Sequence, residues 1–398
     1  MTSRGIRDRV AIVGMGCTPF REHWSKGADD LLIDATTQAA KSAGVGIADI
    51  DAFWLGTLSS GNSGLALSGP LKLQYKPVTR VENFCATGSE SLRAACYAVA
   101  SGAYDIVMAA GVEKLKDAGW SGLPAGEGPG DGTDEPLTAP AMFSMLAPAY
   151  AHEYGLSERQ IRDVLSRIAW KNHQNGALNS LAQFRSPVSL ETIERAPKVA
   201  GMLGVFDCSG VSDGAAAAIV VPADRAYDYT DKPIFVKGLA VAAGPCSGAL
   251  DPGYNFTSFP EVQASAADTY AQAGVTSPRE QLAMAEVHDC FTPTELILME
   301  DLGFAERGLG WKEVLAGTFD ADGELPVNTD GGLKAFGHPI GASGLRMLYE
   351  CWLQLRGEAG DHQVATVAQG RKLALTHNLG GPPGACVSFV GVYGTEPS

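Results

Sequence analysis

A cysteine and a histidine occupy matching positions in two copies of one short sequence pattern. A glycine stands three residues after Cys85 and three residues after His338. A Leu-Arg pair then follows at the same distance in both copies, at positions 92–93 and 345–346. A thiol and an imidazole are the two groups of a Cys-His nucleophilic pair. A duplicated fold that joins its copies at a pseudo-two-fold axis would build such a pair.

Cys85 lies between an apolar run and a turn of small residues that opens a helix-like segment. The positive end of the helix dipole would lower the pKa of a thiol there and raise its thiolate fraction. An inert buried cysteine is the alternative. His338 lies in the turn Gly337-His338-Pro339 at the start of another helix-like segment. Its imidazole could take the Cys85 proton or donate to a carbonyl oxygen. The alternative for this residue is a histidine bonded to the backbone.

The loop His288-Asp289-Cys290-Phe291 directly follows a strand-like run at residues 282–287. The carboxyl ends of strands line the site in parallel α/β sheets. This loop could therefore supply an oxyanion donor and a second acid/base. Alternatively, Asp289 caps the next helix and Cys290 only packs.

A second loop of this kind, His377-Asn378-Leu379-Gly380-Gly381, also follows a strand-like run. Its glycines could expose N–H groups to a developing oxyanion. A glycine-rich turn between two strands is the competing interpretation.

One helix-like segment carries a basic stripe that could meet a phosphorylated ligand, with Arg167 and Lys171 as the candidates. Asp163 interrupts the stripe and can pair with Arg159 or Arg167. Charge along a helix is more often a solvated face.

Composition excludes several classes of protein. The 398 residues carry a formal net charge of −15, which argues against general nucleic-acid binding. No apolar run reaches the roughly 20 residues needed to span a bilayer, and we predict no membrane span and no signal peptide. The eight cysteines are scattered without a C-x-x-C pair, which fits neither a disulfide framework nor a zinc site. Free thiols indicate a reducing, cytoplasmic location.

Apolar runs alternate with helix-like segments through most of the chain. Strand, helix, strand, reactive turn, helix and strand follow one another between residues 9 and 111, and this order returns between 233 and 392. Such alternation favours parallel pairing and an α/β layer. The middle of the chain is different, with a Gly/Pro-rich loop at 114–136 and helical spacing at 142–154 and 157–176. We therefore predict two similar α/β halves and an inserted loop domain: residues 1–112 plus 206–228, residues 231–398, and residues 113–205.

With these motifs the chain resembles the thiolase superfamily, and most closely its sterol-carrier-protein-2-type and acetyl-CoA acetyltransferase branch. The matching segments are VHDCF at 287–291, GGLKAFGHPIGA at 331–342, THNLGG at 376–381 and DCSGVSDGA at 207–215. The resemblance covers essentially the whole chain. It implies a five-layered α-β-α-β-α fold, a homodimer or dimer of dimers, and coenzyme A thioester substrates.

The resemblance also implies roles for individual residues. Cys85 would be the acylated nucleophile, His338 would activate it, and His288 would complete an oxyanion site. Gly380 N–H, with His377 and Asn378 beside it, would form a second oxyanion hole together with the Cys85 N–H. Most thiolases carry a second cysteine in a Cys-x-Gly loop, where this chain has Asn378-Leu379-Gly380. The branch resembled takes that thiol from the other loop, so the acid/base role falls to Cys290.

The function implied is that of an acyl-CoA C-acyltransferase, making or thiolytically cleaving 3-ketoacyl-CoA through an acyl-Cys85 intermediate. The alternatives are a thiolase-fold retro-aldolase acting on steroid or other side-chain acyl-CoA, a ketoacyl synthase, and a non-catalytic lipid-binding subunit. The resemblance implies no metal and no cofactor beyond coenzyme A, with a small OB-fold, zinc-ribbon protein as a possible partner. Residues 114–150 and 246–262 are predicted to shape the acyl pocket.

Overall fold

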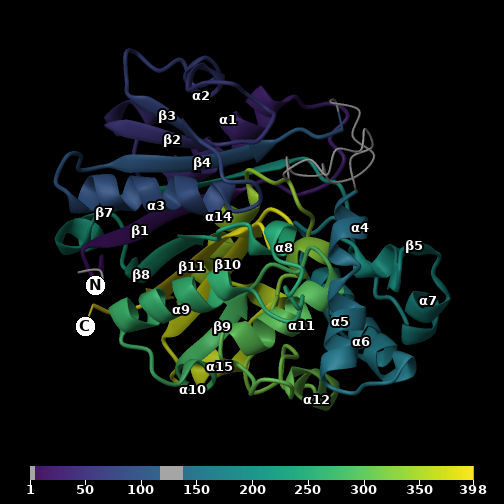
Figure 1. The fold of residues 1–398 in the computed structure, drawn as a ribbon. Coiled ribbons are helices and arrows are strands. Elements are labelled where there is room, and N and C mark those ends of the chain that lie inside the picture. The colour runs from purple at the N-terminus through teal and green to yellow at the C-terminus, as the bar shows by residue number, and fades with distance from the viewer. Residues whose placement is uncertain (1–4, 117–137, 398) are drawn as a thin grey trace.

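Nine strands form one mixed sheet whose two parts come from the two halves of the chain (Figure 1). The structure is a computed structural model that describes residues 5–116 and 138–397. In order across the sheet, the strands are β3 (Val78–Val81), β2 (Ala52–Gly56), β4 (Val107–Glu113), β7 (Gly214–Pro222), β1 (Val10–Cys17), β8 (Ile234–Ala243), β11 (Val387–Gly394), β10 (Leu373–Gly380) and β9 (Leu282–Glu286).

The pairing of these strands confirms that the fold is duplicated. In the first half, β1, β7 and β4 pair antiparallel in turn, and β4 then pairs parallel with β2. In the second half, β8, β11 and β10 pair antiparallel in turn, and β10 then pairs parallel with β9. A parallel bridge between Ala285 and Val327 takes the place of β3 in this second half. Within the described residues, the two halves of the sheet are joined where β1 meets β8, at two residue pairs.

Helices cover both outer faces and fill the space between the half-sheets, which confirms the five-layered arrangement. The central layer holds α3 (Thr87–Ala100) and α14 (Ser343–Arg356), which contact each other and their half-sheets. On the outer faces, α1 (Ala28–Ala43) packs on β1 and β7, and α9 (Pro260–Ala273) packs on β8 and β11 (Figure 1). Three separate clusters of buried apolar residues occupy the spaces between these layers.

The two central helices approach so closely that only glycine fits where they meet. A Cβ atom on Gly88 would lie 2.8 Å from the carbonyl oxygen of Gly341. A Cβ atom on Gly341 would lie 2.5 Å from the carbonyl oxygen of Val112. The repeated glycine of the sequence pattern is therefore a packing requirement, because a larger residue would separate the helix N-termini.

The middle of the chain packs over the second half, on the right of Figure 1. Its longest helix, α6 (Glu158–Ala177), contacts α11 (Thr292–Asp301), α12 (Gly310–Ala316) and α13 (Gly332–Ala335). A capping box between Ser157 and Gln160 opens α6. The predicted helix at 142–154 is instead two helices, α4 (Ala139–Phe143) and α5 (Leu146–Glu153). The domain boundaries given above stay a prediction.

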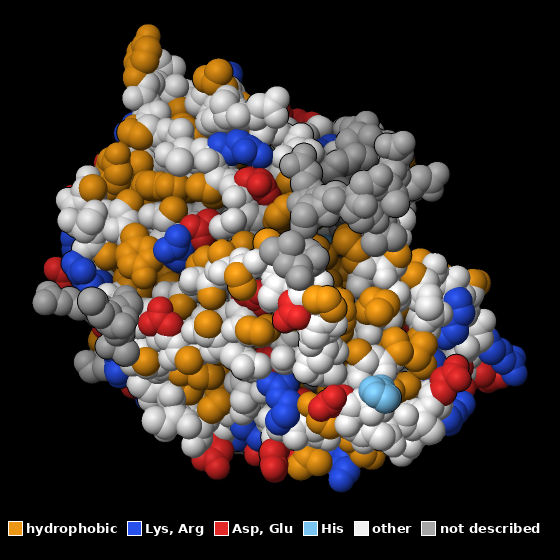
Figure 2. Space-filling view, in the orientation of Figure 1, with side chains coloured by type: hydrophobic (Ala, Val, Ile, Leu, Met, Phe, Trp, Pro, Cys, Tyr) orange, Lys and Arg blue, Asp and Glu red, His pale blue; other side chains and the backbone are white. Residues whose placement is uncertain are grey.

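The remaining elements are short: α2 (Leu65–Ser68), α7 (Leu190–Arg195), β5 (Lys198–Ala200), β6 (Leu203–Gly204), α8 (Ser247–Leu250), α10 (Pro278–Gln281) and α15 (Ala365–Ala368). None of the helices in the described residues is long and apolar enough to cross a membrane. On the face drawn in Figure 2, Lys and Arg side chains are scattered and do not gather into one basic patch.

Candidate active site

Cys85 sits on a strained turn between β3 and α3. The residue before it, Phe84, has a φ of 48°, in the left-handed region that side chains other than glycine rarely adopt. Two bonds of the Thr87 hydroxyl hold this turn, one from the Asn83 N–H at 2.8 Å and one to the Phe84 carbonyl at 2.5 Å. Backbone strain of this kind clusters at functional sites. A Cβ atom on Gly380 would overlap the Asn83 carbonyl, so β10 lies directly against the turn.

His338 is held in the tautomer that leaves its Nε2 free to accept a proton. Ser343 Oγ lies 2.7 Å from His338 Nδ1 and donates its own proton to the Pro339 carbonyl at 2.9 Å. The hydroxyl has one proton, so the imidazole Nδ1–H is the donor in the shorter contact. His338 Nε2 is buried and has no hydrogen-bond partner among the described residues. A neutral imidazole oriented in this way is ready to act as a general base.

Three of the predicted residues converge from separate parts of the chain. Cys85 Sγ and one ring nitrogen each of His288 and His338 all lie within 4.8 Å of one another. The two imidazole rings meet edge to face with centroids 5.4 Å apart. Cysteine and histidine are also zinc ligands, so these three atoms form the one group in the described residues that could hold a metal ion. A metal would need the Cys85 thiolate, and burial disfavours that form.

The pKa of Cys85 is opposite to the sequence-based expectation. Burial, followed by the nearby carboxylates of Glu113 and Glu82, raises the pKa of this thiol to about 12. The expected lowering by the helix dipole was wrong, because burial outweighs it. The pKa of His338 is lowered to about 3, first by burial and then by the charge of Arg346. The resting pair is therefore a neutral thiol beside a neutral imidazole, and the proton must move as the thiol attacks.

Cys290 lies beside this cluster and is also a neutral thiol. Its pKa is raised well above the ordinary value, first by burial and next by the nearby Cys85. Its carbonyl oxygen accepts from the Ser209 N–H at 2.9 Å, which holds the loop against the segment at 207–211. The alternative in which Asp289 caps the following helix does not hold, because its carboxylate accepts from the N–H groups of Leu333 and Lys334 instead.

The strand β10 turns His377 and Asn378 toward opposite faces, because successive side chains on a strand alternate. Asn378 faces the central layer, where its Oδ1 accepts from Ser89 Oγ at 2.5 Å. The imidazole of His377 is fully buried, and burial lowers its pKa to about 3. The two side chains therefore lie on different sides of β10, with Asn378 on the side that meets α3.

Comparison with known proteins places this geometry in a family. Residues 10–224 match the thiolase N-terminal domain, and residues 250–390 match the thiolase C-terminal domain-like family. The chain belongs to the thiolase family. It is 38% identical over 394 residues to the acetyl-CoA acetyltransferase of Methanothermobacter thermautotrophicus, covering 97% of this chain and 99% of that protein. It is 32% identical to sterol carrier protein 2 of Bos taurus, covering 94% of this chain and 70% of that protein.

Solved structures share the thiolase fold over the whole chain. A structure titled as an Ltp2-ChsH2(DUF35) aldolase aligns with a TM-score of 0.82 at 24% identity, covering 99% of each chain. An acetyl-CoA acetyltransferase from Syntrophomonas wolfei aligns with a TM-score of 0.70 at 21% identity, covering 98% of this chain and all of the other. At these identities the likeness concerns the fold alone.

In this thiolase, Arg167 and Lys171, the two candidate phosphate-binding residues of α6, each form an ion pair within the chain. Lys171 is buried, with Nζ 2.7 Å from Glu295 Oε1 and 2.8 Å from the Val327 carbonyl. Arg167 pairs with Asp320 and stacks on the Trp170 ring, with its Cζ 4.3 Å from the ring centroid. Both charges are thus paired within the chain, and a phosphate contact at either residue stays a prediction.

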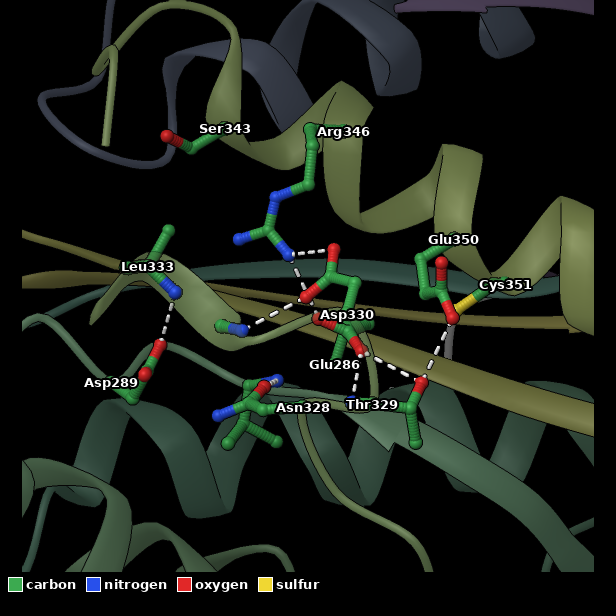
Figure 3. Close-up of polar contacts among 12 residues, drawn as sticks. Glu286, Asp289, Asn328, Thr329, Asp330, Leu333, Ser343, Arg346, Glu350 and Cys351 are labelled. Atoms are coloured by element: carbon green, nitrogen blue, oxygen red, sulfur yellow. Dashed lines mark hydrogen bonds and ion pairs between the residues drawn. The ribbon is translucent and has the colours of Figure 1, made fainter. Parts of the chain in front are cut away.

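A buried network behind the catalytic cluster was not foreseen from the sequence (Figure 3). Arg346 is fully buried, and its Nη1 lies 2.9 Å from Glu286 and 2.5 Å from Asp330. Arg346 is the arginine of the repeated Leu-Arg pair, but its counterpart Arg93 is half-buried and pairs within α3, with Glu90 and the Tyr97 ring. The signal available in the sequence was therefore the repeat itself, which marks the position without revealing its burial.

A pocket of about 350 Å³ opens beside the Cys290 loop in this thiolase. Phe291 forms part of its wall, and Val199 lines it from the strand β5. Lys334 also lines it, and its Nζ donates to the Cys208 carbonyl at 3.1 Å. Most of the lining is apolar, as in sites that bind organic ligands. Of the predicted acyl-pocket segments, residues 117–137 lie outside the described residues.

Four buried histidines predict acid sensitivity of the fold. Burial lowers the pKa of all of them: His173, His288, His338 and His377. Below the unfolded pKa of about 6.5, the unfolded chain binds protons that the folded chain does not, so each histidine removes up to about 1.4 kcal/mol of stability per pH unit. Asp289 and Glu286 act in the opposite direction, because burial raises the pKa of both carboxyls.

We therefore expect the free energy of unfolding to fall by about 3 kcal/mol per pH unit between pH 6 and 5, the net effect of about two protons. Urea unfolding at several pH values measures this slope. The His377→Gln variant removes one titrating group, so its slope should be shallower by about 1.4 kcal/mol per pH unit. An unchanged slope in that variant would show that His377 does not carry a lowered pKa.

Proposed function

We propose that the chain is an acyl-CoA C-acyltransferase that makes or thiolytically cleaves 3-ketoacyl-CoA through an acyl group on Cys85. The observation that carries the proposal is the convergence of Cys85, His288 and His338 within 4.8 Å, with Cys290 beside them. Two relatives named acetyl-CoA acetyltransferase, 38% and 37% identical over nearly the whole chain, support it.

The first step is transfer of an acyl group to Cys85. His338 Nε2 takes the thiol proton as the sulfur attacks the carbonyl carbon, which suits the free Nε2 and the neutral ring. The tetrahedral oxyanion is stabilised by N–H donors, for which we propose the backbone of Gly380 and Cys85, with Asn378 beside them. His288 donates to the thioester oxygen of the second substrate. The leaving group departs as an anion, and acyl-Cys85 remains beside the protonated His338.

Cys290 handles the proton on the substrate α-carbon. In cleavage of a 3-ketoacyl-CoA, the bond between the α and β carbons breaks and leaves a carbanion on the departing acetyl-CoA. A neutral thiol is the form that donates a proton to it, and burial holds Cys290 in that form. Coenzyme A then enters as a thiol and gives its proton to the Cys290 thiolate, and its sulfur takes the acyl group from Cys85. The released Cys85 thiolate regains its proton from His338. In synthesis the same steps run in reverse.

The pocket beside Phe291 is proposed to hold the pantetheine arm of the thioester. It is mostly apolar, and it ends beside the loop that carries Cys290. Lys334 offers an ammonium group to the amide carbonyls of such an arm. The thioester would thereby reach the reacting sulfur atoms without burying the charged nucleotide end.

A bulky residue at the pocket mouth tests this assignment. Val199 lines the pocket and is half exposed, so Val199→Trp should fill the entrance and leave the fold intact. We expect the KM for acyl-CoA to rise at least about tenfold with a smaller change in kcat, because binding is blocked while the reacting groups are untouched. Val199→Ala is the matched control. Equal KM values in both variants would exclude this pocket as the route of the arm.

We also propose that the chain acts in the cytoplasm. We propose that it forms a homodimer, which the edge strand β3 supports. Among the described residues β3 pairs only with β2, and Leu65 and Tyr75 are highly exposed nearby. An open edge with apolar neighbours suits pairing with a second copy. Light scattering of the purified chain measures its mass. A zinc-ribbon partner is proposed more narrowly, because one structural neighbour is titled as a complex with a DUF35 protein.

Thiolysis assays test the proposed function directly. A panel of 3-ketoacyl-CoA esters is incubated with coenzyme A, and loss of the ketoacyl chromophore is followed. The expected result is cleavage that depends on coenzyme A, with the preferred ester identifying the acyl group. Cleavage of a β-hydroxyacyl-CoA without coenzyme A would instead support the retro-aldolase alternative, and inactivity toward every thioester would support a binding subunit.

A further inference from the structure

One buried carboxylate, that of Asp289, joins three segments that meet at the catalytic cluster. It lies between His288 and Cys290 in the loop after β9. Its Oδ1 accepts from the Leu333 N–H at 2.6 Å, in the segment that leads to His338. Its Oδ2 accepts from Asn172 Nδ2 at 2.7 Å, in helix α6 of the middle region. The side chain is fully buried, so these contacts take the place of water.

The segment that leads to His338 is shaped to receive this carboxylate. Gly332 has a φ of +63°, and a Cβ atom there would overlap the carboxylate oxygens of Asp289. The absence of a side chain lets Asp289 reach the N–H groups of Leu333 and Lys334 (Figure 3). On the other side of the same segment, Arg346 holds Asp330 at 2.5 Å. The residues from 330 to 334 are therefore tied on two sides.

We propose that Asp289 is a positioning residue that sets the spacing between the His288–Cys290 loop and His338. It contacts no reacting atom in this proposal. It acts by holding two catalytic segments in one register, and through Asn172 it fixes both to α6. The proposal rests on the proposed acyltransferase function, since it assigns a role within that mechanism.

A carboxylate suits this task better than a neutral side chain. The hydrogen-bond partners of Asp289 at Asn172, Leu333 and Lys334 are all N–H donors, and an ionised carboxylate is a side-chain group that only accepts. Asn172 Nδ2 also donates to Glu295 Oε2 at 2.7 Å, so a second buried acid shares the amide. An asparagine at position 289 would keep an acceptor for Leu333 but would turn an NH₂ group toward Asn172 or Lys334.

The variants Asp289→Ala and Asp289→Asn test the proposal. Two rates are measured for each: acylation of Cys85 by acetyl-CoA, followed by mass spectrometry, and transfer from acyl-Cys85 to coenzyme A. Displacement of reacting groups by about 1 Å can cost about 100-fold in rate. We expect Asp289→Ala to lose about 100-fold in kcat for both steps with KM changed less than about threefold, and Asp289→Asn to recover part of the loss.

Hydrogen exchange of the peptide covering residues 328–337 gives a readout that needs no turnover. Removal of the Asp289 acceptor should speed exchange of the Leu333 amide at least about tenfold, with a smaller effect in Asp289→Asn. Asp301→Asn is the matched control. Asp301 is also a buried acceptor, of the Phe259 N–H at 2.7 Å and of Gln263 at 2.8 Å, but it joins α9 to α11. It should leave exchange at 328–337 and both rates unchanged.

The outcomes separate the two proposals. If the wild-type chain forms no acyl-Cys85 but exchange still quickens in Asp289→Ala, the proposed function fails and the tether stands. If acylation proceeds and both variants keep wild-type rates and exchange, the positioning role is overturned. A loss confined to the transfer step would also overturn it, because Asp289 would then act on Cys290 alone. Equal losses in Asp301→Asn would reduce the effect to general destabilisation.

Discussion

Replacement of Cys85 by alanine is expected to abolish acyl transfer, with a loss of at least about 10⁴-fold in kcat. Cys85 is the thiol that follows the strained turn at Phe84 and shares a cluster with the ring nitrogens of His288 and His338. Without the sulfur atom no covalent intermediate forms, and removal of the nucleophile in a covalent mechanism costs about as much as removal of the whole catalytic set.

The measurement is mass spectrometry after incubation with acetyl-CoA, together with the thiolysis rate. The wild-type chain should carry one acetyl group on the peptide containing Cys85, and Cys85→Ala should carry none. Cys96→Ala is the matched control, because Cys96 is a buried thiol on α3, the helix that follows Cys85, and burial raises its pKa as well. Full turnover by Cys85→Ala would contradict the acyl-enzyme mechanism and favour a lyase.

Replacement of His338 by alanine is expected to slow acylation of Cys85 about 10³-fold, within the usual range for loss of a general base. The loss should be large because the pKa of Cys85, at about 12, leaves almost no thiolate near neutral pH without a proton acceptor. His23→Gln is the control, since His23 is another buried histidine. In the described residues its Nε2 bonds to the Pro19 carbonyl and its backbone N–H donates to Asp213. It should acylate at the wild-type rate.

The pH dependence of acylation gives a second check on His338. A base works only when unprotonated, and the pKa of His338 is lowered to about 3. The imidazole therefore stays neutral as pH falls from 8 to 5, and its protonation should not reduce the acylation rate near pH 6.5. A rate that falls tenfold per unit below pH 6.5 in Asp289→Asn as well as in the wild-type chain, with the protein still folded, would show that His338 titrates normally. The variant removes Asp289, whose pKa is raised to about 7, as the cause.

The repeated Cys-His pattern allowed the fold and the core of the site to be predicted, because the pattern encodes packing. The glycine after each reactive residue is needed where α3 and α14 meet, and the duplicated strand order follows from the same repeat. The raised pKa of the Cys85 thiol could not be predicted in this way. A helix N-terminus contributes about 1 kcal/mol, whereas a rise in pKa from 9 to about 12 corresponds to about 4 kcal/mol.

Long-range contacts of polar residues also escaped prediction. Asp289 precedes a helix by three residues, which favours local capping, yet its acceptors face a segment more than forty residues away. Lys171 lies at regular spacing along a charged stripe, yet its side chain points into the protein toward Glu295. Helical periodicity describes which face a residue occupies, and only the tertiary packing of α6 on α11 and α13 shows that this face is covered.

The contact between Gly88 and Gly341 restricts the residues that both halves can carry at these two positions. Each glycine meets main-chain atoms of the other half. A methyl group at either position would therefore clash with backbone, which no substitution can remove. A larger residue at one glycine could not be accommodated by a smaller side chain in the other half, because the contact there is with backbone. The distance between the Cys85 sulfur and the His338 imidazole thus depends on the absence of a side chain at both glycines. The backbone of each half therefore restricts which residue the other half can carry at this position.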